Sequence, residues 1–267
     1  MSTSRRAVLG AAIGGAVAAG IPGLATAANA QGTPGSAAAW QLRWSPSASV
    51  DKLRAFETLE DDRADSHPAA APHILAEGDT FRFTMHTVDR DTSTDRQRHE
   101  VTGCRDGNSF LQWKKGETWR ITYSMFIPSS LKATTTFTHI MQMKQPGQGT
   151  GPIVVQSLRR SGGRQTIELK LFEQNITVGS TDLEPLHNKW TDVDFQMKIA
   201  DGSAGSVRWI LSSGGTTIID RSRSGVDTFL ADRVRPKWGI YRSLGDSSGS
   251  LQNCHLLLSQ MRAYQLV

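Results

Sequence analysis

Alternation of polar and apolar residues is the dominant pattern of this chain. From residue 80 onward, polar and apolar side chains alternate in short runs separated by Gly, Asp, Asn and Ser. Successive side chains of a strand point to opposite faces of its sheet, so this alternation indicates half-buried strands. It predicts ten strands, at residues 80–85, 119–127, 137–144, 153–158, 166–172, 190–199, 206–211, 216–220, 237–241 and 255–266. Helical turns are expected only within 50–60 and 226–232.

This series of strands fits one domain. The sequence has 267 residues and shows no internal repeat and no later linker that would divide it. All-β sandwiches of this length commonly fold as a single unit. We therefore predict an all-β protein, a β-jelly roll sandwich of two bent antiparallel sheets with a concave substrate cleft, over residues 40–267.

The first thirty residues carry an export pattern. Arg5 and Arg6 precede an apolar stretch rich in Ala and Gly at 7–19, and residues 28–30 (Ala-Asn-Ala) suit signal cleavage. This pattern predicts a twin-arginine signal peptide over 1–30, followed by a flexible leader over 31–39. The expected localisation is therefore secreted, with no membrane attachment after cleavage. A membrane anchor is disfavoured because Pro22 interrupts a weakly apolar segment.

Charge narrows the class of partner. The formal net charge of +5 falls to +3 once the signal and its two arginines are removed. A basic chain can bind nucleic acid, an anionic membrane or an acidic polysaccharide. Nucleic acid is disfavoured because aromatic and basic residues do not interleave as a stacking groove requires. We expect an acidic polysaccharide as the partner of a monomeric protein.

The two cysteines, Cys104 and Cys254, leave two states open. An oxidising exterior would allow a disulfide between them, and two separate buried thiols are the alternative.

Three segments together resemble a known family. They are residues 137–144 followed by Gly-Pro-Ile-Val at 151–154, the run 235–243 (Arg-Pro-Lys-Trp-Gly-Ile-Tyr-Arg-Ser), and an Arg-x-Glu strand at 96–100. Their order resembles secreted polysaccharide lyases of the β-jelly-roll type. The glucuronan lyases are the nearest of these, followed by the alginate and heparin lyases. The resemblance covers roughly residues 80–265.

The resemblance implies three cleft motifs. Arg98-His99-Glu100 matches the Arg-x-Glu motif of the related alginate lyases, and Lys237-Trp238-Gly239-Ile240-Tyr241 matches their Lys-x-Gly-x-Tyr motif. Gln142-Met143-Lys144 departs from their Gln-x-His motif, because lysine replaces the histidine base. Some lyases of this fold use lysine, so the function can survive this replacement.

Cleavage of a uronic acid polymer by β-elimination needs three groups. One neutralises the carboxylate, a base removes the C5 proton, and an acid protonates the leaving 4-oxygen. We expect Tyr241 as the acid and Arg98 with Gln142 at the carboxylate. Lys144 is the expected base, or the cation that activates Tyr241. His139 is the rival base, although alternation places it with Met141 and Met143 on the opposite face from Gln142.

Further residues complete the expected substrate-binding set. Lys237 and Arg242 flank Tyr241 in the motif, Glu100 is expected to orient Arg98, and His86 follows a candidate cleft strand. No metal ligand is expected, since the other histidines show no ligand spacing. No cofactor is required, and a structural calcium ion in the loop 89–100 is disfavoured because Thr94 replaces the usual glycine.

Two other functions compete with the lyase. A non-catalytic carbohydrate-binding jelly-roll protein is the main alternative, because Lys144 departs from the motif. A sandwich-type glycoside hydrolase ranks lowest, because the chain lacks a Glu-x-Asp-x-x-Glu strand that would supply paired carboxylates.

Overall fold

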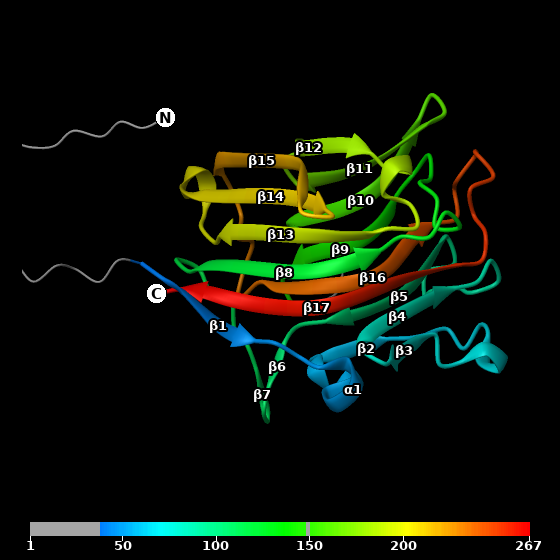
Figure 1. Ribbon diagram of the computed structural model, residues 1–267, viewed down its shortest axis with the longest axis horizontal. Helices are drawn as coiled ribbons and strands as arrows, with labels where there is room; N and C mark the ends of the chain where they lie inside the picture. Colours follow the sequence, from blue (N-terminus) through cyan, green and yellow to red (C-terminus); the bar gives the residue numbers. More distant parts are fainter. Residues whose placement is uncertain (1–37, 148–149) are drawn as a thin grey trace, which may run out of the picture. The chain divides into compact units, whose positions relative to one another are not determined.

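Two large antiparallel sheets make up the computed structural model, which describes residues 38–147 and 150–267 (Figure 1). The predicted signal peptide and most of the predicted leader lie outside these residues. One sheet has eight strands: β15 (Thr216–Val226), β14 (Gly205–Ser213), β13 (Trp190–Lys198), β8 (Thr118–Phe126), β17 (Cys254–Leu266), β4 (Thr80–Met85) and β3 (Ile74–Glu77), with β1 (Trp40–Trp44) also pairing with β17.

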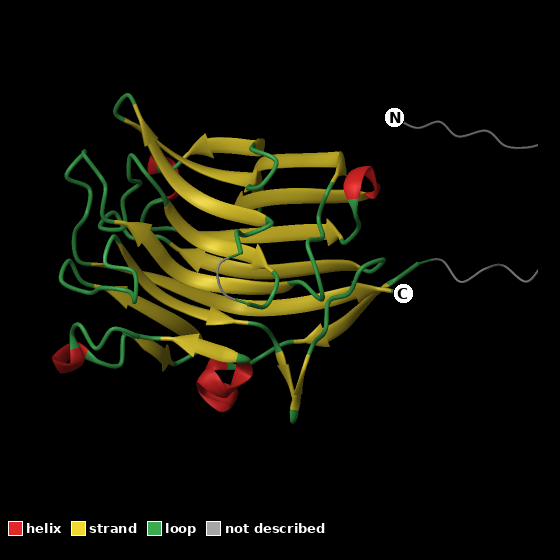
Figure 2. Cartoon of the chain, turned by 180° about the vertical axis from the view of Figure 1, so that it is seen from behind, coloured by secondary structure: helices red, strands yellow, loops and turns green. Residues whose placement is uncertain are grey.

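The second sheet carries the site described below. Its seven strands are, in order, β12 (Ile176–Asp182), β11 (Arg164–Leu171), β10 (Val154–Ser161), β9 (Thr138–Lys144), β16 (Arg235–Ser243), β5 (Arg96–Thr102) and β2 (Thr58–Glu60). Figure 2 shows the curvature of the strands and the few short helices around them. The minor elements are β6 (Arg105–Asp106), β7 (Ser109–Phe110), α1 (Ala48–Asp51), η1 (Lys52–Ala55), η2 (Pro68–Ala70), η3 (Glu184–Leu186) and η4 (Gly202–Ala204).

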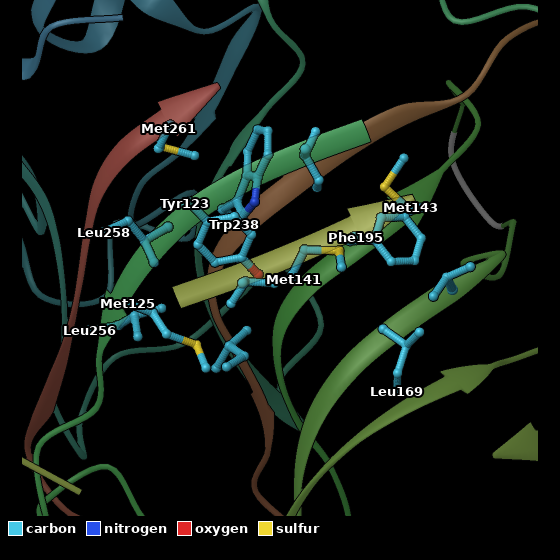
Figure 3. Close-up of a cluster of buried hydrophobic side chains, with 14 of the residues drawn as sticks. Tyr123, Met125, Met141, Met143, Leu169, Phe195, Trp238, Leu256, Leu258 and Met261 are labelled. Atoms are coloured by element: carbon cyan, nitrogen blue, oxygen red, sulfur yellow. The ribbon is translucent and has the colours of Figure 1, made fainter. Parts of the chain in front are cut away.

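The core fills the space between the two sheets. Trp238 of β16 stacks on Trp44 at 5.8 Å between ring centroids and meets Tyr123 of β8 edge to face. Methionines surround this aromatic group, and Figure 3 shows Met125, Met141 and other buried side chains interdigitating. Burial of each large apolar side chain contributes about 1.5–3 kcal/mol. The core therefore fixes one face of the seven-stranded sheet and leaves the other face for polar side chains.

The structure confirms the all-β prediction and places a strand at each of the ten predicted runs. The helical turns expected near residue 50 are α1 and η1, but residues 58–60 form β2. The turn expected within 226–232 was wrong, since β15 runs to Val226 and irregular backbone follows. Within the described residues, no helix has the length and apolar character needed to cross a bilayer.

Candidate active site

A cleft of about 700 Å³ lies on the polar face of the seven-stranded sheet. Its floor comes from β5, β9 and β16, which are neighbours in the sheet. Tyr241 of β16 pairs with Arg98 on one side and with His139 on the other. Arg98, Gln142, Lys144, Lys237, Tyr241 and His139 all line the cleft, so the structure brings together the main residues predicted from the sequence.

His139 faces the cleft because β9 is not regular. Gln156 of β10 pairs with Met141, but the next residue, Ser157, pairs with His139, so β9 holds one extra residue at this point. Ile140 and Met141 both enter the core. Such a bulge reverses the alternation on either side of it. The expectation that His139 lies on the face opposite to Gln142 was therefore wrong.

A second irregularity shapes β16. Trp238 pairs with Met141 and Tyr241 with His139, so three steps on β16 match two on β9. Gly239 lies inside this irregularity at φ +142°, and a Cβ there would lie 2.1 Å from the backbone oxygen of His99. Only glycine fits this close approach of two strands. The glycine of the Lys-x-Gly-x-Tyr motif thus allows the backbones of β16 and β5 to approach closely beside Tyr241.

The hydroxyl of Tyr241 lies in a strongly positive environment. Arg96 donates a hydrogen bond to this oxygen over 2.6 Å, and the guanidinium carbon of Arg98 lies 3.9 Å from the ring centroid. Phe137 packs against the ring at 5.0 Å between centroids. Tyr241 is 8% exposed, so these contacts hold it largely out of water. Two cations beside one phenol stabilise negative charge on its oxygen.

His139 is held as a neutral imidazole. Its Nδ1 lies 2.6 Å from the hydroxyl of Ser157, and its ring stacks on Phe137 at 4.7 Å. Burial, with Arg159 and Arg98 nearby, lowers the pKa of His139 to about 3. Its ring lies 5.7 Å from that of Tyr241. An unprotonated imidazole and a tyrosine hydroxyl therefore occupy the same part of the cleft.

Lys144 occupies a different part of the cleft. It lies five positions from His139 along β9, a distance of roughly 15 Å at the rise of a strand. Its ammonium group donates to the backbone oxygen and to the hydroxyl of Thr150. Burial, together with Lys237, Arg98 and Arg235, lowers the pKa of Lys144. The structure thus separates Lys144 from Tyr241, which weakens the expectation that the two act on one bond.

An ion-pair network centred on buried Glu100 connects polar residues of the floor. Glu100 is fully buried, accepts a hydrogen bond from Gln142 over 2.6 Å and lies 3.0 Å from the Lys237 ammonium nitrogen. Lys237 also donates to Glu60 over 2.6 Å. Glu100 lies 3.8 Å from Arg98, which is farther than its contacts with Gln142 and Lys237. It therefore orients Gln142 and Lys237 more directly than Arg98, the residue that the sequence led us to expect. The Lys237 ammonium group is paired with two carboxylates, those of Glu60 and Glu100. Its role in the site is therefore to position these neighbouring side chains.

Two expected substrate contacts lie elsewhere. Arg242 is 1% exposed and points into the core side of β16, where it donates to Gln97 over 2.6 Å and to the backbone oxygen of Gln252. Its parity along β16 is opposite to that of Tyr241, which explains the error. His86 also lies outside the residues that line the cleft, with its Nδ1 3.3 Å from Asp89.

Sequence reasoning missed other residues of the cleft wall. Arg96 precedes Arg98 by two positions, and their shared parity on β5 was the signal that could have identified it. Arg63 and Asp91 come from two loops and form an ion pair with N–O distance 2.5 Å. No local pattern marks such loop residues. Six cationic side chains and two carboxylates line the cleft in total: Arg63, Arg96, Arg98, Lys144, Arg235, Lys237, Glu60 and Asp91.

Two groups of histidine and aspartate side chains lie close together in the folded chain. His67, His73, His86 and Asp89 gather within 4.8 Å of one another, and Asp61, His73 and His99 form a second group. The sequence shows no ligand spacing among these histidines because the fold brings together segments that are distant in sequence. In the loop considered for calcium, Asp89 contacts His99 and Asp91 contacts Arg98.

The chain resembles known proteins in its fold but matches no family model. No protein-family model matches the chain, and neither does any curated protein. Among solved structures, alginate lyase A1-II', a member of polysaccharide lyase family-7, is similar with TM-score 0.56 and 14% identity over 83% of this chain and 99% of that one. An alginate lyase from Pseudomonas aeruginosa has TM-score 0.51 and 13% identity over 79% and 98%. These likenesses show a shared β-jelly-roll fold.

A third structure shares this fold. It is a variant of A1-II' in which one histidine and one tyrosine are substituted, in complex with the substrate GGMG. It has TM-score 0.50 and 12% identity, over 74% of this chain and 83% of that one.

Proposed function

We propose that this protein is a secreted polysaccharide lyase that cleaves a uronic acid polymer by β-elimination. The observation that carries the proposal is the Tyr241 hydroxyl, bound by Arg96 and lying beside neutral His139 in a cleft with an excess of cations. Cations attract a polyanionic chain, and the tyrosine and histidine can transfer protons. The shared fold with alginate lyases, one of them studied with a histidine and a tyrosine substituted, supports the same reaction class.

The proton transfers follow from the hydrogen bonds. Arg96 donates to the Tyr241 oxygen, which leaves the O–H group of Tyr241 free to donate its proton to the leaving 4-oxygen. Neutral His139 accepts the C5 proton, and the electron pair of that C–H bond forms the 4,5 double bond as the C4–O bond breaks. The phenolate that remains is stabilised by Arg96 and Arg98. Burial and the cations Arg159 and Arg98 disfavour protonation of His139, and a bound carboxylate offsets the effect of the cations.

The carboxylate of the reacting sugar lies against Arg98 and Gln142 in this proposal. Both line the cleft, and Glu100 fixes the Gln142 amide through a 2.6 Å hydrogen bond. Preorganised donors lower the barrier to proton removal because they stabilise charge as it develops. Lys144, farther along β9, then binds the carboxylate of another unit of the same polymer. A glucuronan-like polymer is the preferred substrate on the resemblance of residues 235–243.

Tyr241→Phe tests the proposal. The variant keeps the ring packing and loses the proton donor, so formation of unsaturated product should fall about 10²–10⁴-fold. The measurement is the ultraviolet absorbance of the unsaturated uronate after incubation with glucuronan, alginate, heparin and a plant gum. Tyr264→Phe on β17, in the other sheet, is the matched control and should keep full activity. Undiminished activity of Tyr241→Phe would contradict the proposed role.

A non-catalytic carbohydrate-binding protein is the second candidate. The observation in its favour is that carboxylates already pair Lys237 and Arg98, which leaves fewer free charges for catalysis. Affinity electrophoresis of the wild-type chain in the same polymers separates the two functions. Retarded migration together with unsaturated product supports the lyase, and retarded migration without product supports the binding protein.

A further inference from the structure

A cluster of four histidines and two aspartates lies outside the cleft. It forms where the loop from β2 to β3 meets the loop from β4 to β5, at the right-hand side of Figure 1. His67, His73, His86 and Asp89 come from four separate positions along these loops, and each offers one donor atom within 4.8 Å of the others. His73 and Asp89 are fully buried, whereas His67 and His86 reach the surface.

Three separations between Asp89 and the histidines are close to those of a tetrahedral site. Asp89 Oδ1 lies 2.9 Å from His67 Nδ1 and 3.7 Å from His73 Nε2, and Asp89 Oδ2 lies 3.3 Å from His86 Nδ1. Two atoms that both bind a tetrahedral zinc ion at about 2.0–2.1 Å are separated by roughly 3.3 Å. These three separations from the Asp89 carboxylate differ from the zinc value by no more than about half an ångström, and the ligand atoms of all four residues lie within 4.8 Å of one another.

One buried atom of the cluster has no partner. His73 Nε2 is fully buried and makes no hydrogen bond, although it faces Asp89. An unpartnered buried polar atom costs about 1–3 kcal/mol, so a hydrogen-bond network alone explains this arrangement poorly. The other nitrogen of the same ring, Nδ1, lies 3.0 Å from Asp61. A histidine that binds metal through one nitrogen and a carboxylate through the other is a common arrangement in zinc proteins.

We infer that His67, His73, His86 and Asp89 form a zinc site with four protein ligands. Three imidazoles and one carboxylate favour Zn²⁺ over Ca²⁺ or Mg²⁺, which prefer oxygen ligands. His99 supports the site from behind, because its Nε2 lies 3.1 Å from Asp89 Oδ2 and its ring stacks on His73 at 4.3 Å. His67 and His86 are 29% and 24% exposed in their side chains, which gives the ion a path from solvent.

Zinc binding by the untagged wild-type chain tests this inference. After chelator treatment and dialysis, isothermal titration with Zn²⁺ should show one tight equivalent, and unfolding should shift to higher temperature when zinc is added. Cobalt(II) in place of zinc should give the visible absorption bands of a tetrahedral nitrogen–oxygen site. These readouts do not depend on lyase activity, so their failure is separate from failure of the proposed function.

Variants locate the site. His86→Gln and His67→Gln should each lower zinc affinity at least tenfold. Asp61 contacts the ring of the proposed ligand His73, so Asp61→Asn should lower the affinity about 10–100-fold. His255→Gln on β17 is the matched control and should bind zinc as the wild type does. Circular dichroism establishes that each variant is folded. No stoichiometric zinc binding by folded wild type overturns the inference, as does unchanged affinity in the folded double variant His67→Gln/His86→Gln. If that double variant does not fold, absence of tetrahedral cobalt bands in the wild type overturns it.

Discussion

Arg96 is the residue whose contact with Tyr241 most directly shapes the candidate chemistry. A hydrogen bond from a charged donor is worth about 1.5–3 kcal/mol, and about 1.4 kcal/mol corresponds to a tenfold change in rate. Arg96→Gln should therefore lower kcat about 10–100-fold with a smaller change in KM, as measured by initial rates of unsaturated product. Arg208→Gln, whose arginine pairs with Asp220 on the other sheet, should leave both constants unchanged. Equal losses in the two variants would refute a role specific to Arg96.

His139 gives the molecule a pH-dependent stability. Its pKa is about 3 in the fold against an ordinary value of 6.5, so the native state binds fewer protons between these values than the unfolded state does. By linkage, the contribution of His139 to stability is intact above pH 6.5 and is lost as pH falls toward 3. At about pH 5 the loss approaches an upper limit of about 2 kcal/mol.

Urea unfolding of the wild type and His139→Gln at neutral pH and near pH 5 measures this contribution. Glutamine does not titrate, so the variant should lose less stability than the wild type between the two conditions. Equal losses would show that the imidazole is not held neutral in the native state.

At the scale of elements, the irregularity of β16 depends on Gly239. A Cβ at this position would lie 2.1 Å from a backbone oxygen, and φ is +142°. Gly239→Ala should therefore destabilise the fold by about 2 kcal/mol or more, as measured by urea unfolding. Gly245→Ala is the control, because its Cβ would lie at ordinary contact distance, 3.4 Å from Ser243 Oγ, and should change stability by less than about 0.5 kcal/mol. Similar stabilities for the two variants would contradict the steric account.

Alternation predicts strands well where one face is buried, and poorly where neither face is buried. The run predicted at 80–85 matches β4 because its side chains alternate strictly in burial. β12 went unpredicted because it is an edge strand whose residues are mostly polar, and pairing with β11 supplies its order. The bulges of β9 and β16 depend on partner strands distant in sequence, so no local pattern reveals them.

The residues of the candidate site also divide into those that a local sequence pattern reveals and those that only the fold reveals. Tyr241, Gln142 and Arg98 were identifiable because short sequence motifs contain them. His139 was assigned to the wrong face because one extra residue in β9 reverses parity. Glu60, Arg63 and Asp91 enter the cleft from β2 and loops, so only the folded chain shows their contribution. The histidine cluster was missed for the same reason.

At the scale of the whole molecule, the structure contains no disulfide among its described residues. Cys104 and Cys254 are both buried and unbonded, so the alternative of two separate thiols holds. Burial also raises the pKa of Cys104 and of Cys254, which disfavours the reactive thiolate. Titration with a thiol reagent in denaturant, without reductant, should find two free thiols, while the native protein should react slowly. Detection of no free thiol under these conditions would demonstrate a disulfide.

The strands beneath the candidate site all lie inside their sheet. β16 lies between β9 and β5, β9 also pairs with β10, and β5 also pairs with β2, so each has hydrogen-bonded neighbours on both sides. The cleft wall, by contrast, includes loop residues such as Arg63, Thr92 and Thr150. Loops tolerate insertion and replacement far better than central strands do. If the proposed function holds, replacement of the wall loops would therefore change the polymer that binds, while Tyr241 and His139 would stay fixed on their strands.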